Sequence, residues 1–167
     1  MPSPAAPPRV EVVPADGALR SFAVNVYPLY LHDLSEWSTH YAVQPDGRFA
    51  PWYLDDWLQR DTSSTLALLR NGRPVGFAWV ARRGFPFMSP DRDFKLVEFF
   101  VLRAHRRRGV ASAAAPQVFA RSPGRWELTA ANPPALVFWE RVLDALPVRA
   151  LERHVDGGET SFRFRHD

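Results

Sequence analysis

Residues 95–112 read KLVEFFVLRAHRRRGVAS and contain two different patterns in succession. Residues 95–102 are almost continuously apolar, which predicts a strand at the centre of a sheet, buried on both faces. Four arginines follow, and then Gly109 and a run of small residues predict a helix that extends to about Arg121. The stretch therefore indicates a strand, a basic turn and a helix, in that order.

The start of this helix has the properties of an anion-binding site. The first N–H groups of a helix have no partner within it and form the positive end of the helix dipole. Gly109 allows a ligand to approach the backbone closely. The arginines Arg103, Arg106, Arg107 and Arg108 add charge-assisted hydrogen bonds for a phosphate group. The alternative is a basic loop before an alanine-rich helix without a ligand, and these residues alone leave both interpretations open.

The rest of the chain predicts further strands and helices on both sides of this stretch. The expected strands lie at residues 9–13, 65–70, 74–81, 126–130, 149–155 and 160–165. The expected helices begin near Ala18, Trp52 and Pro133, and Pro28 should bend or end the first of them. Because a strand, a helix and a strand follow one another between residues 95 and 130, we expect a right-handed crossover between parallel strands. The predicted fold class is therefore mixed α/β or α+β.

The composition of the chain is that of a globular protein. Its 167 residues, 46% apolar and 23% charged, fit one domain over residues 9–167 after a flexible, proline-rich tail over residues 1–8. There is no apolar run of membrane-spanning length and no signal-peptide pattern, so we expect a soluble, cytoplasmic protein. The absence of cysteine excludes disulfides, thiolate zinc sites and a cysteine nucleophile, and we expect no metal. The net charge of +3 is too small to predict nucleic-acid binding.

The motif Arg106-x-x-Gly109-x-Ala111 resembles the Arg/Gln-x-x-Gly-x-Gly/Ala signature of the GNAT superfamily, the acyl-CoA-dependent N-acetyltransferases. The strand before it and the later Asn132-x-x-Ala135-x-x-Phe138 are also similar to that family, as is the order of elements over residues 9–165. The stretches PGRWE and FWER resemble a bacterial subgroup of it. The resemblance implies a central mixed sheet of six to seven strands flanked by about four helices.

The resemblance also implies acetyl-CoA as cosubstrate. The backbone of Phe99, Phe100 and Val101 would pair with the pantetheine arm, and an N–H near Val101 would polarise the thioester carbonyl. Asn132 and Ala135 would lie close to the CoA arm where the two parallel strands separate, although Asn132 also fits a helix cap. The pyrophosphate would lie on the loop and first helical turn, formed by Arg107, Arg108, Gly109, Val110, Ala111 and Ser112, and Arg106 of the motif is also expected to bind the cofactor.

The chain departs from the family pattern at the residue expected to protonate the leaving thiolate. Many GNAT enzymes have a tyrosine seven residues after the asparagine, where this chain has Trp139. An indole N–H donates a hydrogen bond but supplies no proton at useful pH. Four tyrosines lie in the region that usually covers the acceptor, and the sequence does not choose among them: Tyr27, Tyr30, Tyr41 and Tyr53.

Two glutamates are candidates for the base that takes a proton from the acceptor amine. Glu98 interrupts an apolar strand, where a carboxylate is costly unless it is paired, hydrated or functional. Glu127 lies on the next strand, five residues before Asn132, a spacing similar to that in some GNAT enzymes. The alternatives are a salt bridge to arginine for Glu98 and an exposed strand position for Glu127.

The acceptor is expected to be a small cationic amine. Residues 31–61 carry a local net charge of −4 together with five tryptophan and tyrosine residues, which favours attraction of a cation, although a solvated helical face is the alternative. Residues 98–101 are also similar to those of diamine acetyltransferases. We expect direct transfer in a ternary complex, because no cysteine is present to form an acyl-enzyme. The alternatives are a non-catalytic acyl-CoA sensor or partner module and, last, an RNA-associated protein; a homodimer is expected only by analogy with the fold.

Overall fold

The computed structural model describes residues 8–59 and 61–167, so the predicted tail lies almost wholly outside the described residues. The strands are β1 (Val10–Pro14), β2 (Ala42–Val43), β3 (Phe49–Ala50), β4 (Ser63–Arg70), β5 (Arg73–Arg82), β6 (Phe94–Val101), β7 (Gly124–Ala130), β8 (Arg149–Asp156) and β9 (Glu159–His166). The α-helices of this described part are α1 (Ala18–Ser35), α2 (Leu54–Leu58), α3 (Val110–Ala120) and α4 (Pro133–Ala145). The small ribbon of β2 and β3 was not predicted, because strands of two residues leave no periodic pattern.

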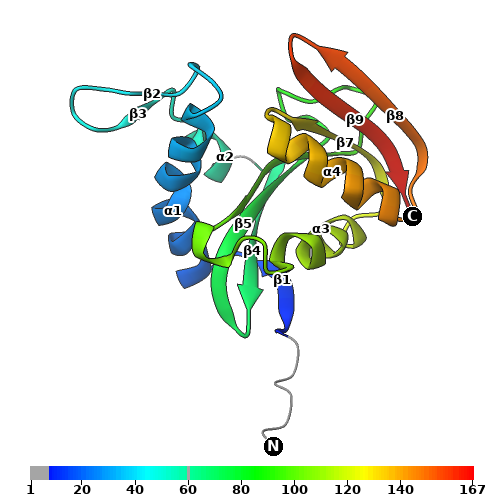
Figure 1. The fold of residues 1–167 in the computed structure, drawn as a ribbon, viewed down its shortest axis with the longest axis horizontal. Coiled ribbons are helices and arrows are strands. Elements are labelled where there is room, and N and C mark those ends of the chain that lie inside the picture. The colour runs from blue at the N-terminus through cyan, green and yellow to red at the C-terminus, as the bar shows by residue number, and fades with distance from the viewer. Residues whose placement is uncertain (1–7, 60) are drawn as a thin grey trace, which may run out of the picture.

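Seven strands form one sheet in the order β1-β4-β5-β6-β7-β9-β8. Its neighbouring strands are antiparallel except β6 and β7, which run parallel and are connected through α3. Helices α1 and α2 pack on one face of the sheet, and α3 and α4 pack on the other (Figure 1). The predicted mixed sheet with a crossover between parallel strands is therefore confirmed.

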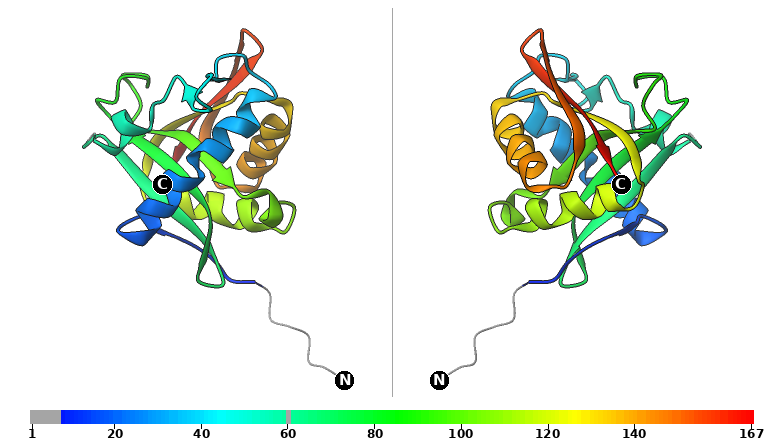
Figure 2. Two further views of the ribbon diagram at one scale, coloured as in Figure 1. Left: turned by 90° about the vertical axis from the view of Figure 1, so that its left-hand side faces the viewer. Right: turned by 90° about the vertical axis from the view of Figure 1, so that its right-hand side faces the viewer.

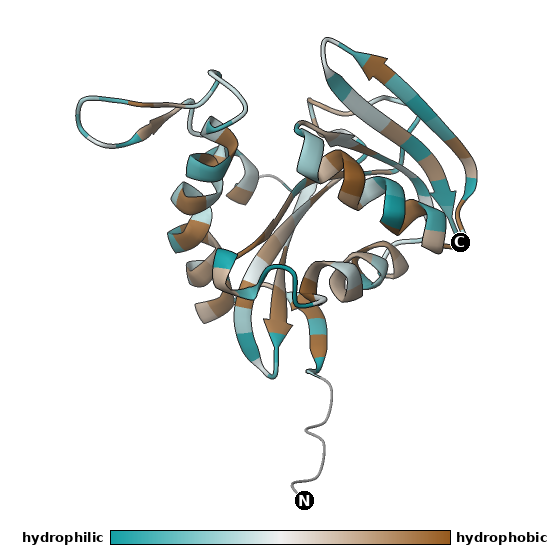
Figure 3. Cartoon of the chain, viewed as in Figure 1, coloured by the Kyte–Doolittle hydropathy of each residue, from teal (hydrophilic) through white to brown (hydrophobic). Residues whose placement is uncertain are grey.

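Each face of the sheet has its own hydrophobic core. Phe119, Trp126 and Phe164 belong to the core beneath α3 and α4, and Tyr27 and Trp79 belong to the core beneath α1 and α2. Hydrophobic residues are concentrated along the central strands between the two helical layers (Figure 3). Full burial of one large apolar side chain contributes about 1.5–3 kcal/mol, so these two cores supply most of the attraction between the layers.

Pro28 does not end the first helix. The helix α1 continues through Pro28 to Ser35. Proline removes one backbone hydrogen bond, whereas Ala23, Tyr27 and Leu31 form a fully buried stripe that spans the proline. Burial of this stripe explains why the helix persists.

A bulge in β6 decides which way Glu98 faces. Trp79 of β5 pairs with Glu98, but the next residue, Val80, pairs with Leu96, so Val97 is an extra residue in β6. In a regular strand Leu96 and Glu98 would share a face, because side chains alternate. The bulge separates them: Leu96 packs in the core beneath α3 and α4, while Glu98 faces α1.

The two parallel strands separate after a short paired segment. Residues Phe94–Leu96 pair with Trp126–Leu128. Both strands continue beyond these pairs, to Val101 and to Ala130, without further pairing to each other among the described residues. Helices α1 and α4 flank the resulting opening (Figure 1 and Figure 2). The separation expected near Asn132 is therefore present.

Candidate active site

Three adjoining cavities cross the molecule where β6 and β7 separate. The cavity beside the arginine loop encloses about 700 Å³ and is called the loop cavity. The central cavity, of about 300 Å³, shares Val101, Arg106, Ala111, Pro134 and Phe138 with it. The third, called the hairpin cavity because the β8–β9 turn borders it, encloses about 700 Å³ and shares Tyr30, Leu34, Trp37 and Asn132 with the central cavity. The central cavity therefore lies between the other two and adjoins both.

The loop cavity is built on the N-terminus of α3. Gly109 is the N-cap residue with φ 77°, a left-handed conformation that favours glycine, and no side chain caps the first turn. The first-turn N–H groups therefore remain free for an anion. The charged residues that line this cavity are all basic: Arg106, Arg107 and Arg141. The arrangement fits a pyrophosphate.

Not every residue predicted for this turn reaches the cavity with its side chain. Ala111 and Ser112 line it. Val110 is buried in the core beneath α3 and α4, so only its backbone N–H is available. Arg108 is exposed and lines none of the three cavities among the described residues.

Arg106 is held in place by protein groups. Its Nε donates a hydrogen bond to the carbonyl oxygen of Val101 at 2.7 Å, and its Nη2 donates to Asp33 of α1. Arg103 donates to the same carboxylate at 2.9 and 2.7 Å. Burial by itself would raise the pKa of Asp33, but the hydrogen bonds from Arg106 and Arg103 outweigh burial and lower it. Asp33 therefore remains ionised and ties α1 to the arginine loop.

The end of β6 offers a free backbone edge to the cavities. Adjacent N–H groups along a strand point to opposite sides. Because Leu102 donates its N–H to Val75 on the β5 side at 2.9 Å, the N–H of Val101 points into the opening left by β7. Phe99 stacks on Phe138 of α4, with ring centroids 6.0 Å apart, and so fixes the strand against that helix.

Asn132 caps α4 and borders the opening between the two parallel strands. Its Oδ1 accepts a hydrogen bond from the N–H of Ala135 at 2.9 Å, which caps α4. Asn132 also lines both the central and the hairpin cavities, and it lies with Ala135 on a small hollow of about 90 Å³ between the separated strands. Capping therefore places Asn132 in the opening.

Glu98 is a buried carboxyl group beside the hairpin cavity. It is 7% exposed and lines the hairpin cavity. The hydroxyl of Tyr30 donates a hydrogen bond to its Oε2, and among the described residues Glu98 forms no ion pair with arginine. Burial raises the pKa of Glu98 well above its usual range. A carboxylate with a raised pKa is suited to accept a proton near neutral pH.

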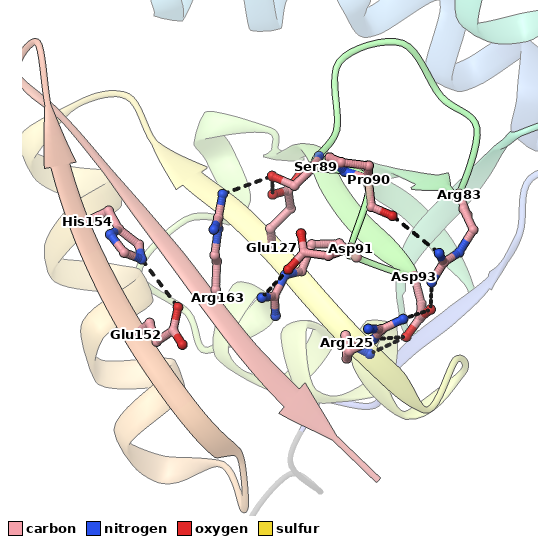
Figure 4. Close-up of polar contacts among 11 residues, drawn as sticks. Arg83, Ser89, Pro90, Asp91, Asp93, Arg125, Glu127, Glu152, His154 and Arg163 are labelled. Atoms are coloured by element: carbon pink, nitrogen blue, oxygen red, sulfur yellow. Dashed lines mark hydrogen bonds and ion pairs between the residues drawn. The ribbon is translucent and has the colours of Figure 1, made fainter.

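Glu127, the other candidate base, lies elsewhere. Its carboxylate accepts hydrogen bonds from the N–H of Ser89 at 2.8 Å and from the Ser89 Oγ at 2.6 Å. Arg163 of β9 donates to the same Oγ at 3.0 Å (Figure 4). Lys95 lies 3.9 Å from the carboxylate. Glu127 thus anchors the loop between β5 and β6, and the structure does not bring it together with Glu98.

The four candidate tyrosines differ in the groups that their hydroxyls contact. Tyr27 is buried beneath α1, and the hydroxyl of Tyr53 lies 3.1 Å from His40 Nε2. Tyr41 and Tyr30 both line the hairpin cavity, but the bond to Glu98 belongs to Tyr30. The sequence alone did not choose Tyr30, because the choice depends on how α1 is rotated over β6.

Only some side chains of the acidic and aromatic segment, residues 31–61, line the cavities. Trp37 and Tyr41 line the hairpin cavity, while Trp57 is buried in the core. Arg60, which entered the charge count, lies outside the described residues. Sequence reasoning missed Glu159, which lines the hairpin cavity just after the turn that follows β8. Glu159 is the first residue of β9, and no periodic signal marks a residue at a strand end as part of a cavity.

Comparisons with known proteins agree with this fold. An acetyltransferase from Thermus thermophilus has a TM-score of 0.56 and 18% identity, covering 94% of this chain and 96% of its own. A histone acetyltransferase HPA2 and related acetyltransferase from Corynebacterium glutamicum has a TM-score of 0.62 and 18% identity, covering 93% and 95%. FeeM, an N-acyl amino acid synthase from uncultured soil microbes, has a TM-score of 0.59 and 11% identity, covering 95% and 91%. No curated protein sequence matches the chain.

The free backbone edge of β6, the uncapped N-terminus of α3 and the buried carboxyl group of Glu98 therefore lie around one set of adjoining cavities. The profile of the Acetyltransferase (GNAT) family matches residues 31–144, more than half of the chain. The chain belongs to the GNAT acetyltransferase family, whose members transfer acyl groups from acyl-CoA to amines of small molecules or proteins. Within the described residues, no helix has the length and hydropathy to span a membrane.

Proposed function

We propose that this protein is an acetyl-CoA-dependent N-acetyltransferase that acetylates a small cationic amine by direct transfer in a ternary complex in the cytoplasm. The observation that carries this proposal is the series of three adjoining cavities, which have a basic helix N-terminus at one end and a buried carboxyl group at the other. Acetyl-CoA entering from the loop cavity and an amine entering from the hairpin cavity would meet near Glu98.

The residues of the loop cavity fit the pyrophosphate of CoA. The uncapped first turn of α3 supplies N–H donors, and Arg107 and Arg141 supply charge. The free edge of β6 supplies backbone groups for the pantetheine arm, and the Val101 N–H is placed to stabilise developing charge on the thioester oxygen.

The residues of the hairpin cavity fit an amine. Glu98 accepts the proton that the amine loses as it attacks. Trp37 and Tyr41 offer aromatic faces, and Glu159 offers a second carboxylate, all of which favour a cationic substrate. We prefer Glu98 to Glu127 as the base, because Glu127 is bonded to Ser89 outside the cavities.

The first test is a thermal melt with acetyl-CoA, with ATP as the control. A ligand at 100 times its Kd stabilises the native state by about 2.7 kcal/mol, which corresponds to roughly 5–10 °C for a chain of this size. CoA release with an added amine is then followed with a thiol reagent, and the chain contributes no background because it has no cysteine. Spermidine, putrescine and an α-amino peptide are the acceptors to compare, and faster release with the peptide than with the polyamines would overturn the acceptor class.

A non-catalytic acyl-CoA-binding module is the second candidate. One observation favours it: Trp139 stands where a tyrosine acid is usual and is buried between Phe99 and Phe119. This candidate predicts a melting shift with acetyl-CoA but no thiol release above the protein-free rate with any of the three acceptors.

A further inference from the structure

The reaction proposed above requires a proton for the departing CoA sulfur. Trp139 does not supply one, because an indole N–H is not acidic at physiological pH. Its ring is also packed among Phe99, Phe119 and Phe138 in the core, with centroid separations of 5.3, 6.2 and 4.7 Å. A proton donor must therefore come from another element.

Tyr30 lies where such a donor is needed. Its ring packs edge-on against Phe77 and Phe100, with centroids 5.8 and 5.6 Å apart, which fixes its direction from α1. It lines the central cavity, the hairpin cavity and the small hollow between the separated strands. Tyr30 therefore borders both the space assigned to the thioester and the space assigned to the amine.

Tyr30 is also coupled to the proposed base. Its hydroxyl donates a hydrogen bond to Glu98 Oε2 within a partly buried setting. Deprotonation of the amine and protonation of the sulfur occur at neighbouring atoms in the same reaction. A base and an acid that share a hydrogen bond can exchange the proton directly instead of through bulk water.

We propose that Tyr30 is the general acid of this enzyme and that Tyr30 and Glu98 form a two-residue proton relay. This inference rests on the proposed acetyltransferase function. In this proposal Tyr30 on α1 protonates the leaving sulfur, because the residue that α4 has at the usual position of the acid is the buried Trp139.

The relay conserves atoms and charge. The Glu98 carboxylate accepts a proton from the attacking amine as the C–N bond forms. As the C–S bond breaks, the Tyr30 hydroxyl gives its proton to the sulfur, and Glu98 returns a proton to the Tyr30 oxygen along their hydrogen bond. One N–H and one C–S bond are broken, one C–N and one S–H bond are made, and both residues return to their starting state.

The test compares Tyr30→Phe with Tyr27→Phe. Tyr27 is one turn earlier on the same helix and lines none of the three cavities among the described residues, so its variant is matched in chemistry and position. CoA thiol release from acetyl-CoA is measured with spermidine and with water alone as acceptor. We expect Tyr30→Phe to lower kcat by about 10²–10⁴-fold with an unchanged Kd for acetyl-CoA, and Tyr27→Phe to retain the wild-type kcat.

The pH profile separates an acid from a residue that only positions Glu98. The other ionisable groups that line the cavities around the pair or contact Tyr30 are Tyr27, Asp33, Glu36, His40, Tyr41, Lys95, Arg103, Arg106 and Glu159. The wild-type kcat should fall at alkaline pH as Tyr30 loses its proton, and this fall should be absent in Tyr30→Phe. A Tyr30→Phe variant with the wild-type kcat and the wild-type alkaline fall would overturn the relay and leave the acetyltransferase proposal intact.

Two further outcomes are decisive. A wild-type protein that binds no acetyl-CoA, or binds it and releases no thiol with either acceptor, overturns both the function and the relay. If Tyr30→Phe does not fold, kcat of the wild-type protein is measured in mixtures of H₂O and D₂O. A curved dependence on the D₂O fraction supports two protons in motion, and a linear one contradicts the relay.

Discussion

Asp33 on α1 and Arg106 in the arginine loop form a partly buried contact between elements that are far apart along the chain. The same carboxylate also accepts hydrogen bonds from Arg103. Because α1 carries Tyr30 as well, the helix that faces Glu98 is attached to the loop that faces the phosphate end of the cavities. The position of the loop and the position of Tyr30 are therefore coupled through one helix.

Replacing Asp33 tests this attachment. Asp33→Asn keeps the shape of the side chain but removes the charge that two arginines share, so we expect a loss of about 1–2 kcal/mol in the free energy of unfolding, reduced by the exposure of Arg103. The pKa of Asp33 is lowered in the folded state, so its stabilisation is present above about pH 3.9 and is lost as the pH falls through the lowered pKa. Urea unfolding at pH 7 measures this loss in the free energy of unfolding. Asp46→Asn, at an exposed ion pair, is the control and should change little.

Replacing Glu98 should lower activity and raise stability at the same time. Burial raises its folded-state pKa above the unfolded value of about 4.3, so the stability contributed by the protonated carboxyl is fully present below that pH and is lost as the pH rises through the raised pKa. Glu98→Gln is neutral at every pH, and we expect it to melt above the wild type at pH 8 and close to it at pH 4. Its kcat should fall by about 10²–10⁴-fold.

The same substitution at Glu127 should lower stability and leave activity almost unchanged. Glu127→Gln weakens the hydrogen bonds from Ser89 and leaves kcat near the wild-type value, while the melt shows a loss of about 1–3 kcal/mol. Full turnover in Glu98→Gln, or a collapse of turnover in a folded Glu127→Gln, would mean that the base is assigned to the wrong glutamate.

Gly76 on β5 should not tolerate even alanine. A Cβ at this position would lie 2.1 Å from the carbonyl oxygen of Phe100, which is backbone on the strand that borders the cofactor cavities. The strands must shift, and such overpacking costs about 1–3 kcal/mol. We expect Gly76→Ala to lower the melting temperature and to weaken acetyl-CoA binding in calorimetry. Unchanged values for both would show that β6 moves freely at Phe100.

Arg107 should contribute to binding of the phosphate end of acetyl-CoA. It lines the loop cavity, and among the described residues it has no hydrogen bond or ion pair of its own. We expect Arg107→Ala to raise the Kd for acetyl-CoA about tenfold, the equivalent of 1.4 kcal/mol, with a smaller difference at high salt because charges are screened. Arg73→Ala, the same charge change at the exposed start of β5, is the control. An equal Kd for both variants would exclude a direct contact by Arg107.

The sequence by itself determined the order of the main elements and the place of the basic turn that starts α3. These depend on residues that are neighbours along the chain: the apolar run at 95–102, the glycine that starts α3, and the asparagine that caps α4. Local patterns of this kind predict a strand, a turn or a helix start directly. The mixed α/β fold class was obtained in this way, whereas the separation of the strands near Asn132 was implied by the resemblance to the GNAT family.

Only the tertiary structure decided which side chains meet. The bulge at Val97 turns Glu98 towards α1, and the rotation of α1 brings Tyr30, rather than Tyr27, to its carboxylate. Folding of the β5–β6 loop onto β7 gives Glu127 a partner in Ser89 and keeps it outside the cavities. Strand register and helix rotation depend on packing between segments that are distant along the chain. The sequence therefore offered both glutamates and all four tyrosines as candidates, but it did not show which of them share a site.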